Sequence, residues 1–134
     1  DQPYQSEDKA GNTAKSIEYF DLAYDYYNQA LAIDDKNFDA TYSLGALYYN
    51  KAASYTDKIN ELSNDFSAAG TKKYDAMKAE MDSQFAKARP YFISSEQLNP
   101  ADGNPLIALK EIYARANEFE KVAEYKAKIE ALGK

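Results

Sequence analysis

The chain has 134 residues, a formal net charge of −6 and neither cysteine nor histidine. This length fits a single domain, and the missing thiol and imidazole groups exclude Ser-His and Cys-His nucleophiles, histidine bases and the usual zinc sites. The 22 acidic residues outnumber the 16 basic ones, which argues against nucleic acid as a partner because phosphate backbones attract clustered Lys and Arg. Ala, Leu and Tyr dominate the apolar residues, and Ala and Leu are strong helix formers, so the composition predicts an all-α fold.

Other classes of function are also disfavoured by the residue pattern. No run approaches the roughly 20 apolar residues needed to cross a bilayer, so we expect no membrane insertion. The acidic pair Asp34-Asp35 lacks the loop spacing of a calcium site, and Gly70 stands alone rather than in a phosphate-binding loop. The sequence therefore predicts a protein that is not an enzyme and that uses no metal and no cofactor. The chain begins without Met, and we expect a processed or excised piece.

The first predicted repeat covers about residues 4–35. Ala23 and Tyr27 stand at helical spacing and mark its second helix, while Gly11 falls 12 residues earlier than Ala23, where the first helix of a helical hairpin carries a glycine. The alanines around Gly11 are small, so this first helix is expected to be loosely packed. The polar run at residues 34–37 predicts a break before the next repeat.

The second predicted repeat covers about residues 37–100 and follows the helical-hairpin pattern W-x₂-L-G-x₂-Y…A-x₃-F…P most closely. Gly45 and Ala88 are small where two helices must approach closely, and Pro100 ends the second helix. Thr41 replaces the Trp of the pattern, and the matching residues are Leu44, Gly45, Tyr48, Ala88, Phe92 and Pro100.

An insertion at about residues 52–84 separates the two helices of this repeat. Ala23 and Ala88 are 65 residues apart, which is 31 more than the 34 residues that separate Ala88 and Val122. Apolar residues continue at helical spacing through the insertion in both directions. They are Tyr48, Ala52, Tyr55, Ile59, Leu62 and Phe66 outward, then Tyr74, Met77, Met81, Phe85, Ala88 and Phe92 on the return.

The insertion is expected to form a long antiparallel coiled-coil hairpin. Two helices of about 27 residues would each be about 40 Å long, and their apolar stripes are interpreted as the hairpin core. Gly70 and Thr71 predict a helix stop followed by an N-cap, which places the tip near residues 65–71. Pro90 predicts a kink in the returning helix. The protruding tip is a candidate contact surface.

The third predicted repeat covers about residues 104–132. Leu106, Leu109 and Tyr113 lie on its first helix, and Val122 follows Tyr113 after nine residues, which is the uninterrupted spacing. Asn104-Pro105 predicts an N-cap with proline in the first helical turn. Gly133 predicts the end of the last helix.

With Ala23, Ala88 and Val122 each opening one pattern, the chain resembles the tetratricopeptide repeat (TPR) family over nearly its whole length. The resemblance implies one domain, residues 1–134, folded as a right-handed α-solenoid of about three helical hairpins with the middle one extended. Residues 37–49 and 108–115 also resemble bacterial TPR proteins whose penultimate repeat carries an inserted helical segment. Members of that group are often exported in Gram-negative bacteria, which slightly favours an exported or periplasmic location over the cytoplasm.

The resemblance also implies a function, because the first helices of TPR hairpins line a concave groove that commonly holds an extended peptide. Tyr42 and Tyr49 would serve as anchors, since tyrosine is enriched at binding hot spots. In register, the groove includes Asn12, Tyr42, Tyr49, Asn50, Glu111 and Arg115. The expected function is a noncatalytic scaffold that binds a protein or peptide through the groove, the protruding hairpin or both.

Two other interpretations stay open. Exposed tyrosine faces can stack on sugar rings, which fits an accessory glycan-binding role in bacterial nutrient uptake. An incomplete first repeat fits docking on a neighbouring repeat or self-association with a second copy of the chain.

Overall fold

The computed structural model describes residues 9–133, and the side chains of residues 9–14 and 16 lie outside that description. All regular structure in this range is helical, so the predicted all-α fold is confirmed. The helices are α1 (Lys9–Ile33), α2 (Phe38–Ala53), α3 (Thr56–Leu62), α4 (Ala68–Leu98), α5 (Gly103–Arg115) and α6 (Phe119–Leu132). Between Lys9 and Gly133, no helix combines the length and the apolar character that crossing a bilayer requires.

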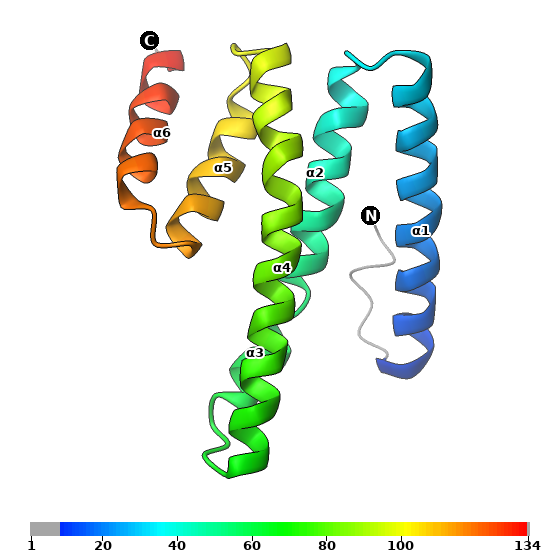
Figure 1. Ribbon diagram of the computed structural model, residues 1–134, viewed down its shortest axis with the longest axis vertical. Coiled ribbons are helices and arrows are strands. Elements are labelled where there is room, and N and C mark those ends of the chain that lie inside the picture. The colour runs from blue at the N-terminus through cyan, green and yellow to red at the C-terminus, as the bar shows by residue number, and fades with distance from the viewer. Residues whose placement is uncertain (1–8, 134) are drawn as a thin grey trace.

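The five longer helices form a row in the order α1, α2, α4, α5, α6, and each runs opposite to its neighbour (Figure 1). The short helix α3 packs beside the first part of α4, and this pair projects beyond the rest of the row. The most extensive packing joins α2 to α4, followed by α5 to α6. The row therefore has two end helices, α1 and α6, and a centre built around α4.

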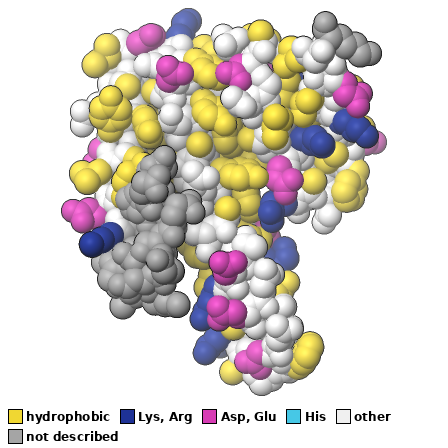
Figure 2. Space-filling model, turned by 180° about the vertical axis from the view of Figure 1, so that it is seen from behind, with side chains coloured by type: hydrophobic (Ala, Val, Ile, Leu, Met, Phe, Trp, Pro, Cys, Tyr) yellow, Lys and Arg dark blue, Asp and Glu magenta, His cyan; other side chains and the backbone are white. Residues whose placement is uncertain are grey.

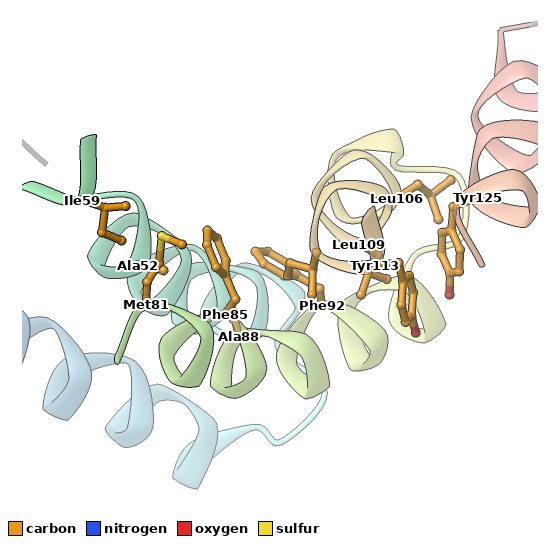
Figure 3. Packing of buried hydrophobic residues seen from close by; sticks show 11 residues of the cluster. Ala52, Ile59, Met81, Phe85, Ala88, Phe92, Leu106, Leu109, Tyr113 and Tyr125 are labelled. Atoms are coloured by element: carbon orange, nitrogen blue, oxygen red, sulfur yellow. The ribbon is translucent and has the colours of Figure 1, made fainter. Parts of the chain in front are cut away.

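The core is a continuous strip of side chains along α4 and the helices on either side of it (Figure 3). Phe92, Ala88 and Leu109 are almost completely buried at its centre. Gly45 lies against the Phe92 ring, so the prediction that Gly45 and Ala88 permit a close helix approach is confirmed. The strip comprises Ala52, Ile59, Met81, Phe85, Ala88, Phe92, Leu106, Leu109, Ile112, Tyr113 and Tyr125.

Side-chain caps explain where α2 and α5 begin. The Asn37 side chain accepts a hydrogen bond from the Ala40 N–H at 3.0 Å, after the predicted polar break. Asp102 plays the same part for α5, accepting from the Asn104 N–H at 2.9 Å. The prediction that Asn104 is the N-cap is therefore wrong by two residues, because the carboxylate of Asp102 reaches the free N–H groups first. Gly133 is the C-cap of α6, as predicted.

The predicted first hairpin within residues 4–35 is not present in the described part of the chain. Lys9–Ile33 is one continuous helix, so Gly11 and Ala23 lie on the same helix rather than on two antiparallel ones. Gly11 alone does not end a helix, since an internal glycine costs only about 1 kcal/mol relative to alanine. Two polar residues follow it directly, but no proline does, and the helix continues through them.

The outgoing helix of the insertion is also not continuous. It stops at Ala53 and restarts at Thr56, because the Tyr55 N–H bonds to the Ala52 carbonyl at 3.1 Å and tightens the turn. The predicted pair of unbroken helices of about 27 residues is therefore wrong on the outgoing side. On the return side α4 has 31 residues and continues through the exposed Pro90.

The tip of the insertion turns slightly earlier than predicted. Ser67 is the N-cap of α4 and accepts a hydrogen bond from the Gly70 N–H at 3.0 Å. Gly70 and Thr71 thus lie in the first turn of α4, and the predicted stop at Gly70 with a cap at Thr71 is wrong. Phe66, predicted as part of the apolar stripe, is 89% exposed because it falls in the turn rather than on a helix.

Candidate functional site

The predicted groove tyrosines lie on the side of α2 that meets α4. Tyr42 and Tyr49 are two helical turns apart and both contact the Phe92 ring, with ring centroids 5.4 and 6.2 Å away. Tyr49 also meets the Phe85 ring edge-on at 5.2 Å. Each tyrosine is half-buried, so its ring belongs to the edge of the core while part of the side chain reaches solvent.

A charged pair on α5 completes this cluster. The Arg115 Nε lies 3.1 Å from the Glu111 carboxylate, four residues earlier on the helix. The Arg115 guanidinium also lies over the face of Phe85, 4.6 Å from the ring centroid. Phe85 therefore contacts both Tyr49 of α2 and Arg115 of α5. We call Tyr42, Tyr49, Glu111 and Arg115 the tyrosine–arginine cluster.

The electrostatics confirm that these residues act on one another. Burial raises the pKa of the Tyr49 hydroxyl, the Glu111 carboxylate raises it further, and the Arg115 charge partly opposes them. Burial likewise raises the pKa of Tyr42, with a smaller contribution from Asp102 at the start of α5. Both hydroxyls therefore stay protonated near neutral pH and can donate and accept hydrogen bonds.

Four of the six predicted site residues thus come together at the α2–α4–α5 junction. Asn50 is exposed at the end of α2, next to Tyr49 in the chain. The side chain of Asn12 lies outside the described residues. The register argument did not find the parts played by Phe85 and Phe92, because their helical spacing is equally typical of simple core residues. The contact between Arg115 and the Phe85 ring could not be predicted either. The two residues are 30 positions apart, so their contact depends on the fold.

An open hollow of about 240 Å³ lies at the tip of the insertion. Asp65 organises the turn beside it by accepting hydrogen bonds from the Ser67 backbone N–H at 3.0 Å and the Ser67 hydroxyl at 2.7 Å. These hydrogen bonds lower the pKa of the Asp65 carboxyl. The hollow is lined by Leu62, Ser63, Asp65, Phe66, Thr71 and Tyr74.

Both places offer polar groups next to aromatic rings. The tyrosine–arginine cluster offers two hydroxyls, one cation and one carboxylate on an aromatic floor, and the tip offers an exposed phenyl ring beside a carboxylate. Within residues 9–133, nowhere do three or more Asp or Glu side chains gather as a metal would require. Comparison of the chain with family models and with curated proteins gives no match.

Proposed function

We propose that this protein is a noncatalytic scaffold that binds a protein or extended peptide at the tyrosine–arginine cluster. The observation that carries the proposal is the seating of Tyr42 and Tyr49 on the buried rings of Phe85 and Phe92. A tyrosine held in this way loses little side-chain freedom when a ligand arrives, which is the usual property of a binding anchor. Arg115 and Glu111 add charged groups of both signs beside it.

A TPR-like architecture would place this cluster in a peptide-binding groove. The antiparallel pairs α2–α4 and α5–α6 coincide with the second and third predicted repeats. In that reading α2 and α5 are the first helices of their hairpins and face the groove, and α1 is the second helix of an earlier hairpin. We propose a right-handed solenoid of this kind, belonging to a bacterial scaffold protein.

The projecting part of the middle hairpin is proposed as a second contact surface. Helix α3 and the first half of α4 pack together around Ile59 and Met81. The exposed ring of Phe66 lies at its far end, beyond the rest of the row. Together with Leu62 and Tyr74 it lines the open hollow at the tip, which offers a partner an apolar contact beside a carboxylate.

A crosslinking pull-down with three variants tests the two surfaces separately. In the double variant Tyr42→Phe/Tyr49→Phe only the two hydroxyls are removed, so the ring packing is retained. A second variant lacks residues 53–83, which removes the tip and restores the predicted 34-residue spacing. The third, Tyr91→Phe, is the control, because Tyr91 is also half-buried but stacks on Tyr48 and lies outside the tyrosine–arginine cluster.

We expect the double tyrosine variant to lower partner affinity by about tenfold, since each lost hydroxyl removes a hydrogen bond worth about 0.5–1.5 kcal/mol. If only the shortened chain loses the partner, the partner binds at the tip rather than at the tyrosine–arginine cluster. Partners retained by both variants, with helicity unchanged by circular dichroism, would contradict the proposal. Glycan binding by the same tyrosines would instead appear as ligand-induced shifts of the Tyr42 and Tyr49 resonances in a panel of glycans.

A further inference from the structure

Helix α1 packs on α2 with its inner face, and its outer face is exposed. The inner face packs on α2, where the Phe20 and Tyr24 rings meet the Tyr48 ring with centroids 5.4 and 6.3 Å apart. Lys51 of α2 adds a cation–π contact with Phe20 at 4.6 Å. These contacts hold α1 in the row, so the residues on its outer face are not needed for that packing.

An apolar stripe runs along this outer face. Leu22, Tyr26 and Ile33 are separated by four and seven residues, which aligns them along one side of a helix. Their side chains are 63%, 68% and 89% exposed. Exposed apolar side chains that follow one another in this way are typical of a helix-docking surface, whereas scattered ones need no explanation.

An acidic row lies directly beside the apolar stripe. Glu18, Asp21 and Asp25 are separated by three and four residues and are all exposed. Among the described residues, none of the three carboxylates takes part in an ion pair. No Lys or Arg occurs between Lys15 and Lys36, and in the described part of the chain these two exposed lysines form no ion pair with the row.

We infer that the outer face of α1 docks a cationic amphipathic helix of a partner protein. Apolar side chains of such a helix would cover Leu22, Tyr26 and Ile33, while Lys or Arg beside them would face the acidic row. A second copy of the chain would bring a net charge of −6 to an acidic face. Residues 1–8 contain three acidic residues and no Lys or Arg, so like charge disfavours them as the occupant too.

The test uses the full chain and two synthetic peptides of about 18 residues. Both consist of Leu, Ala and Lys in the same proportions. In the striped peptide Leu recurs at helical spacing i, i+4, i+7, i+11 with Lys alongside, and in the scrambled peptide the order is shuffled to remove the stripe. Titration calorimetry measures affinity, and the gain in peptide helicity on binding is followed by circular dichroism.

Two sets of substitutions separate the stripe from the acidic row. L22Q/Y26Q/I33Q removes the apolar side chains, and its control is I107Q/F119Q/L132Q, since these three residues are also exposed but lie on α5 and α6. E18Q/D21N/D25N removes three charges from α1, and its control is D39N/E120Q/E130Q, which removes three exposed charges from α2 and α6. All substituted side chains are at the surface, so we expect the fold to persist.

We expect the striped peptide to bind at least about tenfold more tightly than the scrambled one, as a few apolar anchors would provide. L22Q/Y26Q/I33Q should bind the two peptides equally. E18Q/D21N/D25N should bind the striped peptide more weakly and with a smaller dependence on salt. The two control variants should keep the affinity and the salt dependence of the unaltered protein. Amide shifts in the unaltered protein give a readout that depends on no variant. Shifts centred on residues 18–33 would support the inference, and shifts centred on Tyr42 and Tyr49 would overturn it. Equal affinity for both peptides, or a dimer of the unaltered protein that L22Q/Y26Q/I33Q disperses, would also overturn it.

Discussion

Gly45 shows how one small side chain determines the spacing of two helices. A Cβ atom added there would lie 2.9 Å from Cε1 of Phe92, closer than ordinary carbon contacts. The Phe92 ring is only 1% exposed and is enclosed by its neighbours, so it has little room to move away. The absence of a side chain at Gly45 is therefore what allows α2 to pack against α4 over the centre of the core.

We predict that Gly45→Ala is less stable than Gly103→Ala by about 1–3 kcal/mol. Overpacking a core costs roughly that amount, whereas a Cβ at Gly103 meets only the Leu132 Cδ1 atom at an ordinary 3.7 Å. Both substitutions gain helix propensity, so the difference between them reports the contact with Phe92. Urea unfolding of the two variants measures it. Equal midpoints would show that the helices separate freely to admit the methyl group.

At the scale of elements, the positions at which helices begin depend on side-chain caps that compete along a few residues of chain. The tip of the insertion offers Ser67 and Thr71, and both residue types are favoured at N-caps. Ser67 is the N-cap because Asp65 accepts hydrogen bonds from the Ser67 N–H and hydroxyl. These bonds hold Ser67 in the extended conformation of a cap.

We predict that Ser67→Ala destabilises the start of α4 by about 1 kcal/mol, the usual value of a serine N-cap. Thr71→Ala should change stability by less than about 0.5 kcal/mol, as expected for an exposed position without a special role. Native-state hydrogen exchange at residues 70–75 measures the effect locally. Faster exchange in the Thr71 variant than in the Ser67 variant would contradict the observed cap.

At the scale of the whole molecule, tyrosine side chains hold both ends of the row. At one end Tyr48 lies between Tyr24 of α1 and Tyr91 of α4. At the other, the Tyr125 hydroxyl of α6 donates to the Glu96 carboxylate of α4 at 2.7 Å, and Lys128 reaches the same carboxylate at 2.8 Å. Burial, followed by the interaction with Glu96, raises the pKa of Tyr125.

We predict that stability falls as the pH rises from about 10 to about 12. Burial raises the pKa of Tyr48 from 10.0 to about 12, with smaller contributions from Tyr24 and Tyr91. Folding thus favours the neutral hydroxyl, so its stabilisation is complete below pH 10.0, the unfolded pKa, and is lost as the pH passes the folded pKa of about 12. Urea unfolding at several alkaline pH values measures the loss.

Two variants assign this alkaline transition. Tyr48→Phe keeps the ring but has no proton to lose, so part of the pH dependence should disappear. Tyr26→Phe is the matched control, because Tyr26 is 68% exposed on the outer face of α1. A pH dependence that is the same in Tyr48→Phe as in the unaltered protein would contradict the assignment.

Much of the fold was predictable because helix formation follows local patterns. The spacing of Leu44, Tyr48, Ala88 and Phe92 indicated two helices with small residues between them, and the structure confirms both points. The errors lie where local signals were weak or competed. Gly11 did not end α1, Ser54 and Tyr55 interrupted the outgoing helix, and Asp102 replaced Asn104 as a cap.

The sequence predicted which residues form the candidate site, but not how they contact one another. Register placed Tyr42, Tyr49, Glu111 and Arg115 on helices expected to be neighbours, and the structure brings them together around Phe85. The spacing could not show that the aromatic floor comes from the returning helix of the insertion. That contact depends on how α4 is rotated against α2 and α5, which no short pattern encodes.

The sequence by itself determined the helical class and most of the residues that face the core, because both depend on spacing along a few turns. Only the tertiary structure decided which faces remain uncovered. The stripe of Leu22, Tyr26 and Ile33 has the same helical spacing as a core stripe, and its exposure follows from the position of α1 at the end of the row. Figure 2 shows how widely apolar side chains reach the surface of the row compared with the charged projecting hairpin. An apolar residue is buried only if another element covers it, and that depends on the whole arrangement of helices.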